Sequence, residues 1–202
     1  MAAIPSPLHP FAIVVAAAML ILLPSASLAG DADLLQDICV ADLTSTVKVN
    51  GFACKATVTS DDFYFKGLAV AGNTSTTTGS VVTAANVVQV PGLNTLGVSL
   101  SRIDYAPGGV NAPHTHPRAT EMIFVLQGTL DVGFVTAAGN RLVAKTLSAG
   151  DVFVFPRGLV HFQRNAGDGP TAVLAAFNSQ LPGTQSLAAA MFAAEPEVPT
   201  PC

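Results

Sequence analysis

Three histidines and one glutamate lie in two short segments framed by glycine and proline, and their types and spacing are suited to binding a metal ion. His114 and His116 are two residues apart, and Glu121 follows in the same segment. In an extended strand, residues i and i+2 face the same side, so both rings can reach one ion. Two histidines and one glutamate rarely complete the coordination of a transition metal, and we expect His161 to supply the fourth ligand.

Glu121 would face away from the two rings if one unbroken strand carried all three residues. Pro117 interrupts that strand, and residues 117–120 can bend the chain so that the carboxylate returns to the same side. Imidazole suits zinc, copper, iron or nickel, and the carboxylate also admits manganese, so the residues alone predict a divalent transition metal. On a six-coordinate ion, four protein ligands leave open positions, as a catalytic metal site requires.

Short apolar runs separated by turn residues make up the body of the chain. Some keep the period of two expected of strands, as at Leu96, Val98 and Leu100. Residues 122–126 are apolar throughout, which predicts a strand covered on both faces. Because no long helical pattern interrupts the series, we predict an all-β antiparallel barrel or jelly roll with the site inside it. The predicted strands are 85–90, 96–105, 121–127, 129–135, 141–147, 152–155, 160–163 and 171–177.

The length of the chain and its first 29 residues together predict a single, exported domain. The 202 residues fit one domain plus a leader, and the net charge of −4 argues against a nucleic-acid partner. Residues 1–29 contain no charged side chain, and the apolar run 11–23 is shorter than the ~20 residues that cross a membrane. Small residues at 27–29 predict a signal peptide cleaved after Ala29, and hence a secreted protein without a membrane partner.

Two spaced motifs resemble those of the cupin superfamily, and other segments resemble the germin-like proteins of plants. The segments QDICVAD (36–42), NGFACK (50–55), PGLNTLGVSL (91–100) and HTHPRATE (114–121) carry the second resemblance, which covers nearly all of the chain after the leader. The first cupin motif matches Gly108, His114, His116, Glu121 and Gly128, and the second matches Gly150, Pro156, Gly158, His161 and Asn165.

This resemblance implies a cupin barrel that binds Mn²⁺ in the apoplast or cell wall, and it suggests three functions. The first is superoxide dismutase activity in defence or stress, with small oxygen species as substrates. The second is oxalate oxidation, in which Asn111 would bind the small anion. Oxalate-oxidising members carry another asparagine where this chain has Ser101, whose hydroxyl is shorter, so we rank this activity lower. The third is a non-enzymatic metal-binding or structural role in the wall, because fold does not imply function.

The termini complete the expected organisation. A bridge between Cys39 and Cys54, which matches the family's N-terminal disulfide, would close a short loop and contribute about 3 kcal/mol. Asn73 opens a glycosylation sequon in a Gly/Thr/Ser-rich loop. The family implies a homo-oligomer, a trimer or hexamer, although the short C-terminus and the remaining Cys202 depart from its usual helical extension. We divide the chain into a signal peptide (1–29), an irregular disulfide-closed segment (30–62), the barrel (63–182) and a short tail with one helix-capable piece, 186–194 (183–202).

Overall fold

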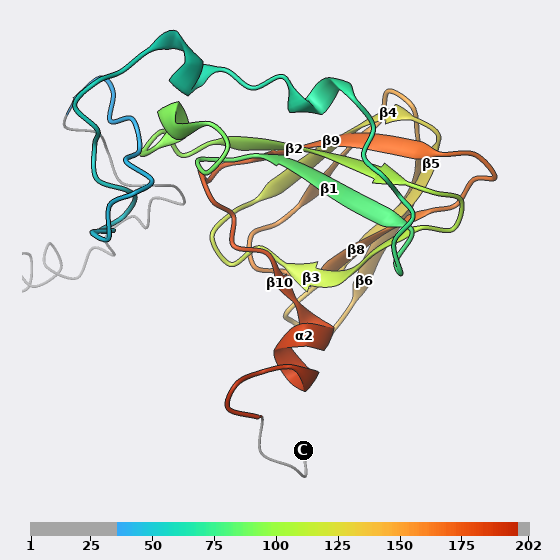
Figure 1. Ribbon diagram of the computed structural model, residues 1–202. Helices are drawn as coiled ribbons and strands as arrows, with labels where there is room; N and C mark the ends of the chain where they lie inside the picture. Colours follow the sequence, from blue (N-terminus) through green and yellow to red (C-terminus); the bar gives the residue numbers. More distant parts are fainter. Residues whose placement is uncertain (1–35, 198–202) are drawn as a thin grey trace, which may run out of the picture.

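The computed structural model describes residues 36–197, and two five-stranded antiparallel sheets form its body (Figure 1). The first sheet has the order β1 (Ser80–Ala85), β2 (Ser99–Tyr105), β9 (Thr171–Phe177), β4 (Glu121–Gln127) and β7 (Val152–Phe155). The second has the order β10 (Gln185–Ser186), β3 (Val110–Thr115), β8 (His161–Asn165), β5 (Thr129–Val135) and β6 (Leu142–Ser148). The predicted all-β antiparallel barrel or jelly roll is therefore confirmed.

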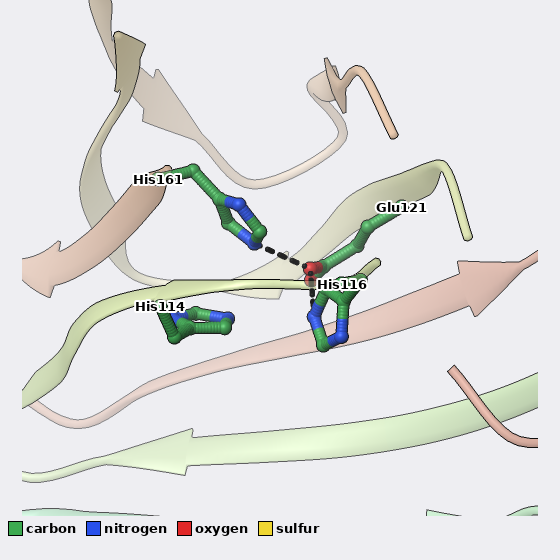
Figure 2. A group of neighbouring side chains, drawn as sticks. All are labelled: His114, His116, Glu121 and His161. Carbon is green, nitrogen blue, oxygen red and sulfur yellow. Dashed lines mark hydrogen bonds and ion pairs between the residues drawn. The ribbon is translucent and has the colours of Figure 1, made fainter. Parts of the chain in front are cut away.

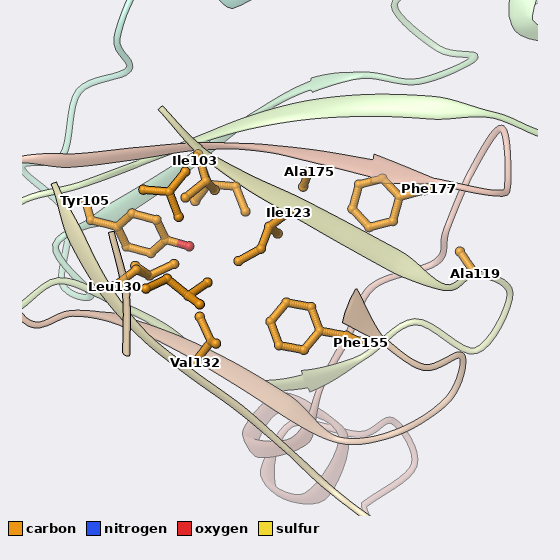
Figure 3. Packing of buried hydrophobic residues seen from close by; sticks show 12 residues of the cluster. Ile103, Tyr105, Ala119, Ile123, Leu130, Val132, Phe155, Ala175 and Phe177 are labelled. Carbon is orange, nitrogen blue, oxygen red and sulfur yellow. The ribbon is translucent and has the colours of Figure 1, made fainter. Parts of the chain in front are cut away.

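A hydrophobic core fills the space between the two sheets (Figure 3). Period-two strands build it, since Leu130 and Val132 of β5 are buried while Asp131 between them is partly exposed. Burying each such side chain contributes about 2 kcal/mol. The core lies beside the end of the sandwich that holds the histidines, because Phe155 stacks on the His161 ring with 4.5 Å between ring centroids. The core thus supplies a rigid apolar wall for the candidate site.

Several predicted strands match the structure, and the differences have local causes. Strands β4, β5, β7 and β9 begin and end where the sequence predicted. The predicted strand 85–90 is wrong, because Asn86 accepts a hydrogen bond from the Val88 amide and turns the chain there. Strand β3 was missed as a separate element, because its alternation is broken by Pro113, where the pairing with β8 shifts register.

The expectation that residues 122–126 are covered on both faces is wrong in the single chain. Ile123 and Val125 are buried, whereas Met122 is 48% exposed and Phe124 is 43% exposed. Strand β4 lies between β9 and β7, and its outer face is not covered by any described element that contacts it extensively. The unbroken apolar run therefore comprises one face that is buried in the core and one apolar face that is exposed.

The segment before the barrel is irregular, as predicted, and lies along the first sheet (Figure 1). It contains two 3-10 helices, η1 (Ser60–Phe63) and η2 (Gly67–Ala69), and a third, η3 (Pro91–Leu93), follows β1. The Cys39–Cys54 disulfide is present, with 4.8 Å between the two Cα atoms. Buried Asn94 donates to the Phe52 carbonyl over 2.9 Å, which ties the disulfide-closed loop to the barrel.

The tail beyond the barrel forms β10 and then the short helix α2 (Leu187–Phe192). Ser186 caps this helix by accepting a hydrogen bond from the Ala189 amide. Within residues 36–197, no helix is long and apolar enough to cross a membrane. The predicted signal peptide and Cys202 lie outside the described residues.

Candidate metal centre

Strand ends bring the four predicted metal ligands together from three strands (Figure 2). His114 lies in β3, directly opposite His161 at the start of β8, and His116 follows β3 by one residue. Glu121 is the first residue of β4. One ligand atom from each of the four residues lies within 4.8 Å of the others, and all four side chains are buried. The two sequence segments therefore form one cluster.

The chain bends between His116 and Glu121, as the proline in this segment led us to expect. The Ala119 amide donates to the His116 carbonyl over 3.3 Å, which closes a turn over residues 116–119. The Thr120 amide then donates to Oδ1 of Asn178 over 2.8 Å and fixes the entry into β4. This turn returns Glu121 to the side of the histidine rings.

Glu121 is the centre of the cluster. Its Oε2 lies 3.0 Å from Nε2 of His116 and 3.0 Å from Nε2 of His161, and Glu121 itself is 1% exposed. Burial alone would raise the pKa of this carboxyl, but hydrogen bonds from His116 and His161 outweigh it and lower the pKa to about 2. The carboxylate is therefore ionised and available as an anionic ligand.

The Nδ1 atoms of the three histidines face away from the cluster. Nδ1 of His114 donates to the Ala112 carbonyl over 2.7 Å, and Nδ1 of His161 donates to the Leu159 carbonyl over 2.8 Å. A carbonyl only accepts, so Nδ1 carries a hydrogen in both rings and Nε2 is the ring atom directed at the site. Burial, followed by the neighbouring His161, lowers the pKa of His114 to about 4. His114 is therefore neutral, as a metal ligand must be.

These donors fit a divalent transition metal. Three imidazole nitrogens and one ionised carboxylate face a common point, and hydrogen bonds or packed rings hold each ligand in place. Phe177 packs edge-on against His116 with 4.9 Å between ring centroids, and Phe155 covers His161. The arrangement is therefore prepared to bind an ion without large rearrangement.

A buried amide that the sequence analysis missed connects the cluster to its surroundings. Gln163 is fully buried, and its Nε2 donates to Oε1 of Glu121 over 3.1 Å. Its Oε1 accepts hydrogen bonds from the Tyr105 hydroxyl at 3.0 Å and from Nδ2 of Asn111 at 2.8 Å. Gln163 lies two residues after His161, so the strand period could have identified it as sharing the ligand face.

A small cavity opens beside three of the ligands, His114, His116 and Glu121. Its volume is about 120 Å³, and both Asn111 and Ser101 line it, as do the apolar side chains of Ile103 and Phe177. The amide of Asn111 therefore lies in the same cavity as the metal ligands, but its Nδ2 already donates to Gln163. Any molecule that binds next to the ion has room for only a few heavy atoms.

Three further polar residues lie outside the ligand cluster. Asn165 is buried and donates to the carbonyls of Ala106 and Gly169, so it organises the turn after β8. Arg118 is on the surface, where its Nε donates to the Leu181 carbonyl over 2.9 Å. Asn73 is exposed, and its Oδ1 accepts a hydrogen bond from the Ser75 amide. Its side chain is accessible for the predicted glycosylation.

Comparisons with known proteins agree with the fold. Residues 66–201 match the family model described as cupin. The chain is 78% identical to "Germin-like protein 5-1" of Oryza sativa subsp. japonica, over 92% of this chain and 84% of that protein. It is 66% identical to "Germin-like protein subfamily 2 member 1" of Arabidopsis thaliana, over 86% of this chain and 80% of that protein.

A solved structure described as recombinant oxalate oxidase in complex with glycolate has a similar fold. It superposes with a TM-score of 0.80 and 47% identity, over 84% of this chain and 87% of that chain. The chain therefore belongs to the cupin family and, within it, to the germin-like proteins.

Proposed function

We propose that this protein binds manganese through His114, His116, Glu121 and His161 and dismutates superoxide in the extracellular space of plant tissue. In this reaction two superoxide ions and two protons give one molecule of oxygen and one of hydrogen peroxide. The observation that carries the proposal is the cluster of four buried ligands, three of which, His114, His116 and Glu121, line a cavity of about 120 Å³. Among the metals that suit these ligands, the resemblance to the germin-like family favours manganese.

The charge of the site favours a small anionic substrate. Glu121 is the single anionic ligand among three imidazoles, so a divalent ion held there keeps a net positive charge. In a buried cavity this charge is weakly screened and attracts superoxide. A bound manganese ion would supply the one-electron redox chemistry that dismutation requires.

The residues of the chain hold and shield that centre. The backbone carbonyls that bind His114 and His161 keep their Nε2 atoms directed inward, and Gln163 holds Oε1 of Glu121. Phe155 packs on His161 and Phe177 on His116, and Asn111 lines the cavity beside the ligands, where a substrate would approach a bound ion.

Oxalate oxidation is the second candidate, and the likeness to the oxalate oxidase structure favours it. Asn111 lines the cavity where such an anion would bind. Against it, Ser101 offers a shorter donor than an asparagine, and Asn111 already donates to Gln163. A non-enzymatic role is the third candidate, in which the metal only stabilises the barrel in the wall.

Secretion and oligomerisation form part of the same proposal. The disulfide and the exposed Asn73 suit an oxidising, glycosylating export route. The outer face of β4 and β7 pairs Met122 with Val154 and Phe124 with Val152, and all four side chains are exposed. Such a patch is typical of an oligomer interface, and we assign it to contact with another copy of the chain.

The test uses the full chain, secreted from plant cells and assayed after its metal content has been measured. We expect superoxide dismutation in proportion to bound manganese, and loss of tight metal binding in His114→Ala and His161→Ala. Lys145→Ala, at an exposed position in β6, is the control and should retain both properties.

Two results would contradict the proposal. Full metal content in either histidine variant would disprove the ligand assignment. A manganese-loaded wild-type protein without dismutase activity would exclude the proposed reaction. Peroxide formed from oxalate by that protein would then select the second candidate, and inactivity on both substrates would select the third.

A further inference from the structure

The three histidines of the cluster differ in what holds their outer nitrogen. His114 and His161 each face a main-chain carbonyl two residues earlier in their own segments. His116 instead faces a side chain from the tail, because Nδ1 lies 3.3 Å from the hydroxyl oxygen of Thr184. These two residues are 68 positions apart, so the contact exists only in the folded barrel.

The segment that carries Thr184 connects β9 to β10 (Figure 1). Both Pro182 and Thr184 line the cavity of about 120 Å³. Immediately after Thr184, β10 pairs with β3, where Gln185 is opposite Thr115 and Ser186 is opposite His114. The segment is therefore attached to the strand that supplies the first histidines.

Arg118 fixes the other side of this segment. Its Nε donates to the Leu181 carbonyl over 2.9 Å, and its guanidinium lies against Gly183. A Cβ atom on Gly183 would lie 2.2 Å from Nη2 of Arg118, and the φ of +73° at this residue favours glycine. Leu181–Thr184 is thus clamped between Arg118 and β3, with the Thr184 hydroxyl placed at the His116 ring.

We propose that Thr184 is a positioning residue of the metal centre, whose hydroxyl sets the orientation of the His116 ring. The inference rests on the metal site of the proposed function and extends it to a residue outside the cupin motifs. Partners that hydrogen-bond to the far side of a metal ligand fix its ring and tautomer, and removing one costs about 10- to 100-fold in metal affinity.

A hydroxyl suits this position because it both donates and accepts. When Nε2 of His116 donates to Oε2 of Glu121, at 3.0 Å, Nδ1 accepts and the Thr184 hydroxyl can donate to it. When Nε2 is a metal ligand, Nδ1 carries the hydrogen and the same hydroxyl can accept. A carbonyl can only accept, so a neutral ring beside one must carry its hydrogen on Nδ1, as in the second arrangement. His116 is therefore the ring whose tautomer can change when an ion binds.

The test compares Thr184→Val, which removes the hydroxyl but keeps the β-branched shape, with Thr184→Ser, which keeps the hydroxyl. Thr184 is exposed to solvent, so neither change disturbs the core. Thr146→Val is the matched control, because the Thr146 hydroxyl bonds Asp131 on the exposed face of β6. The measurements are the manganese dissociation constant of the full chain and the ring ¹⁵N chemical shifts of His116 in the metal-free protein.

We expect Thr184→Val to weaken manganese binding about tenfold and to shift the His116 ring signals while those of His114 and His161 stay in place. The manganese dissociation constants of Thr184→Ser and of the control Thr146→Val should both stay within about threefold of the wild-type value. Unchanged affinity and ring shifts in Thr184→Val would overturn the proposal, as would equal losses in the serine and valine variants. The metal-free ring shifts decide the role of Thr184 even if the wild-type protein proves inactive towards superoxide.

Discussion

Nε2 of Gln163 donates a hydrogen bond over 3.1 Å to Oε1 of Glu121, the oxygen that does not contact the histidine rings. The same glutamine accepts from Tyr105 and Asn111. Burial, and then the charge of Glu121, raises the pKa of the Tyr105 hydroxyl well above its usual value, so this group stays protonated and donates. One amide therefore links the candidate metal ligand, the hydrophobic core and the cavity wall.

Replacing this amide by an apolar side chain should damage both stability and metal binding. Gln163→Met leaves polar groups of Glu121 and Tyr105 buried without their partner, so we expect a loss of about 2 to 4 kcal/mol in the free energy of unfolding. Metal affinity should fall at least about tenfold, because Glu121 loses its orientation. Denaturant unfolding and metal titration measure the two effects. Gln89→Leu, at an exposed position, is the control, and equal behaviour of the two variants would refute the role of Gln163.

Ser101 limits oxalate oxidation if its short side chain is the missing donor of the cavity. Ser101→Asn should then raise oxalate-dependent peroxide formation about tenfold, the effect of one additional hydrogen bond to a charged substrate. Peroxide release is measured with manganese-loaded protein at saturating oxygen. Ser148→Asn, on the exposed face of β6, should change nothing. A Ser101→Asn protein as inactive as wild type would show that another part of the cavity sets the limit.

The stability of the metal-free protein should fall as the pH is lowered from about 6.5 to about 4. The folded state holds the pKa of His114 at about 4, below its ordinary value of 6.5, so in this window the unfolded chain binds a proton that the folded chain does not. Acidification therefore favours unfolding, by about 3 kcal/mol once the pH reaches 4. Urea unfolding of the metal-free chain at several pH values measures the slope of the free energy of unfolding against pH. In His114→Asn the slope should be smaller, and an identical slope would contradict the assignment.

The disulfide should stabilise the protein by restricting the unfolded chain. Cys39 and Cys54 are 15 residues apart, and replacing both with serine should lower the free energy of unfolding by about 3 kcal/mol. Urea unfolding of the double variant and of wild type, both without reductant, measures this difference. Metal binding should persist, because the loop is attached to η3 by the hydrogen bond from the Ala41 amide to the Pro91 carbonyl and lies outside the ligand cluster. Loss of metal from a folded double variant would show that the loop also supports the site.

Local patterns in the sequence were enough to predict the fold class and the candidate ligands. Turn residues and apolar runs placed β5 and β9 at their observed limits, and the disulfide followed from two nearby cysteines. The spacing of His114 and His116, with the proline after them, indicated a shared face and a bend before Glu121. These features depend on residues within a few positions of one another, where strand period and turn chemistry act directly.

Only the tertiary structure could decide contacts that depend on how strands pair. The hydroxyl of Thr184 meets His116 because β10 aligns with β3, and the outer face of Met122 stays open because no described element packs closely on it. Neither fact has a local signal, since sheet register and the packing of distant segments are set by the whole core. The sequence by itself determined which residues can bind the ion, and the pairing of the strands decided what holds them in place.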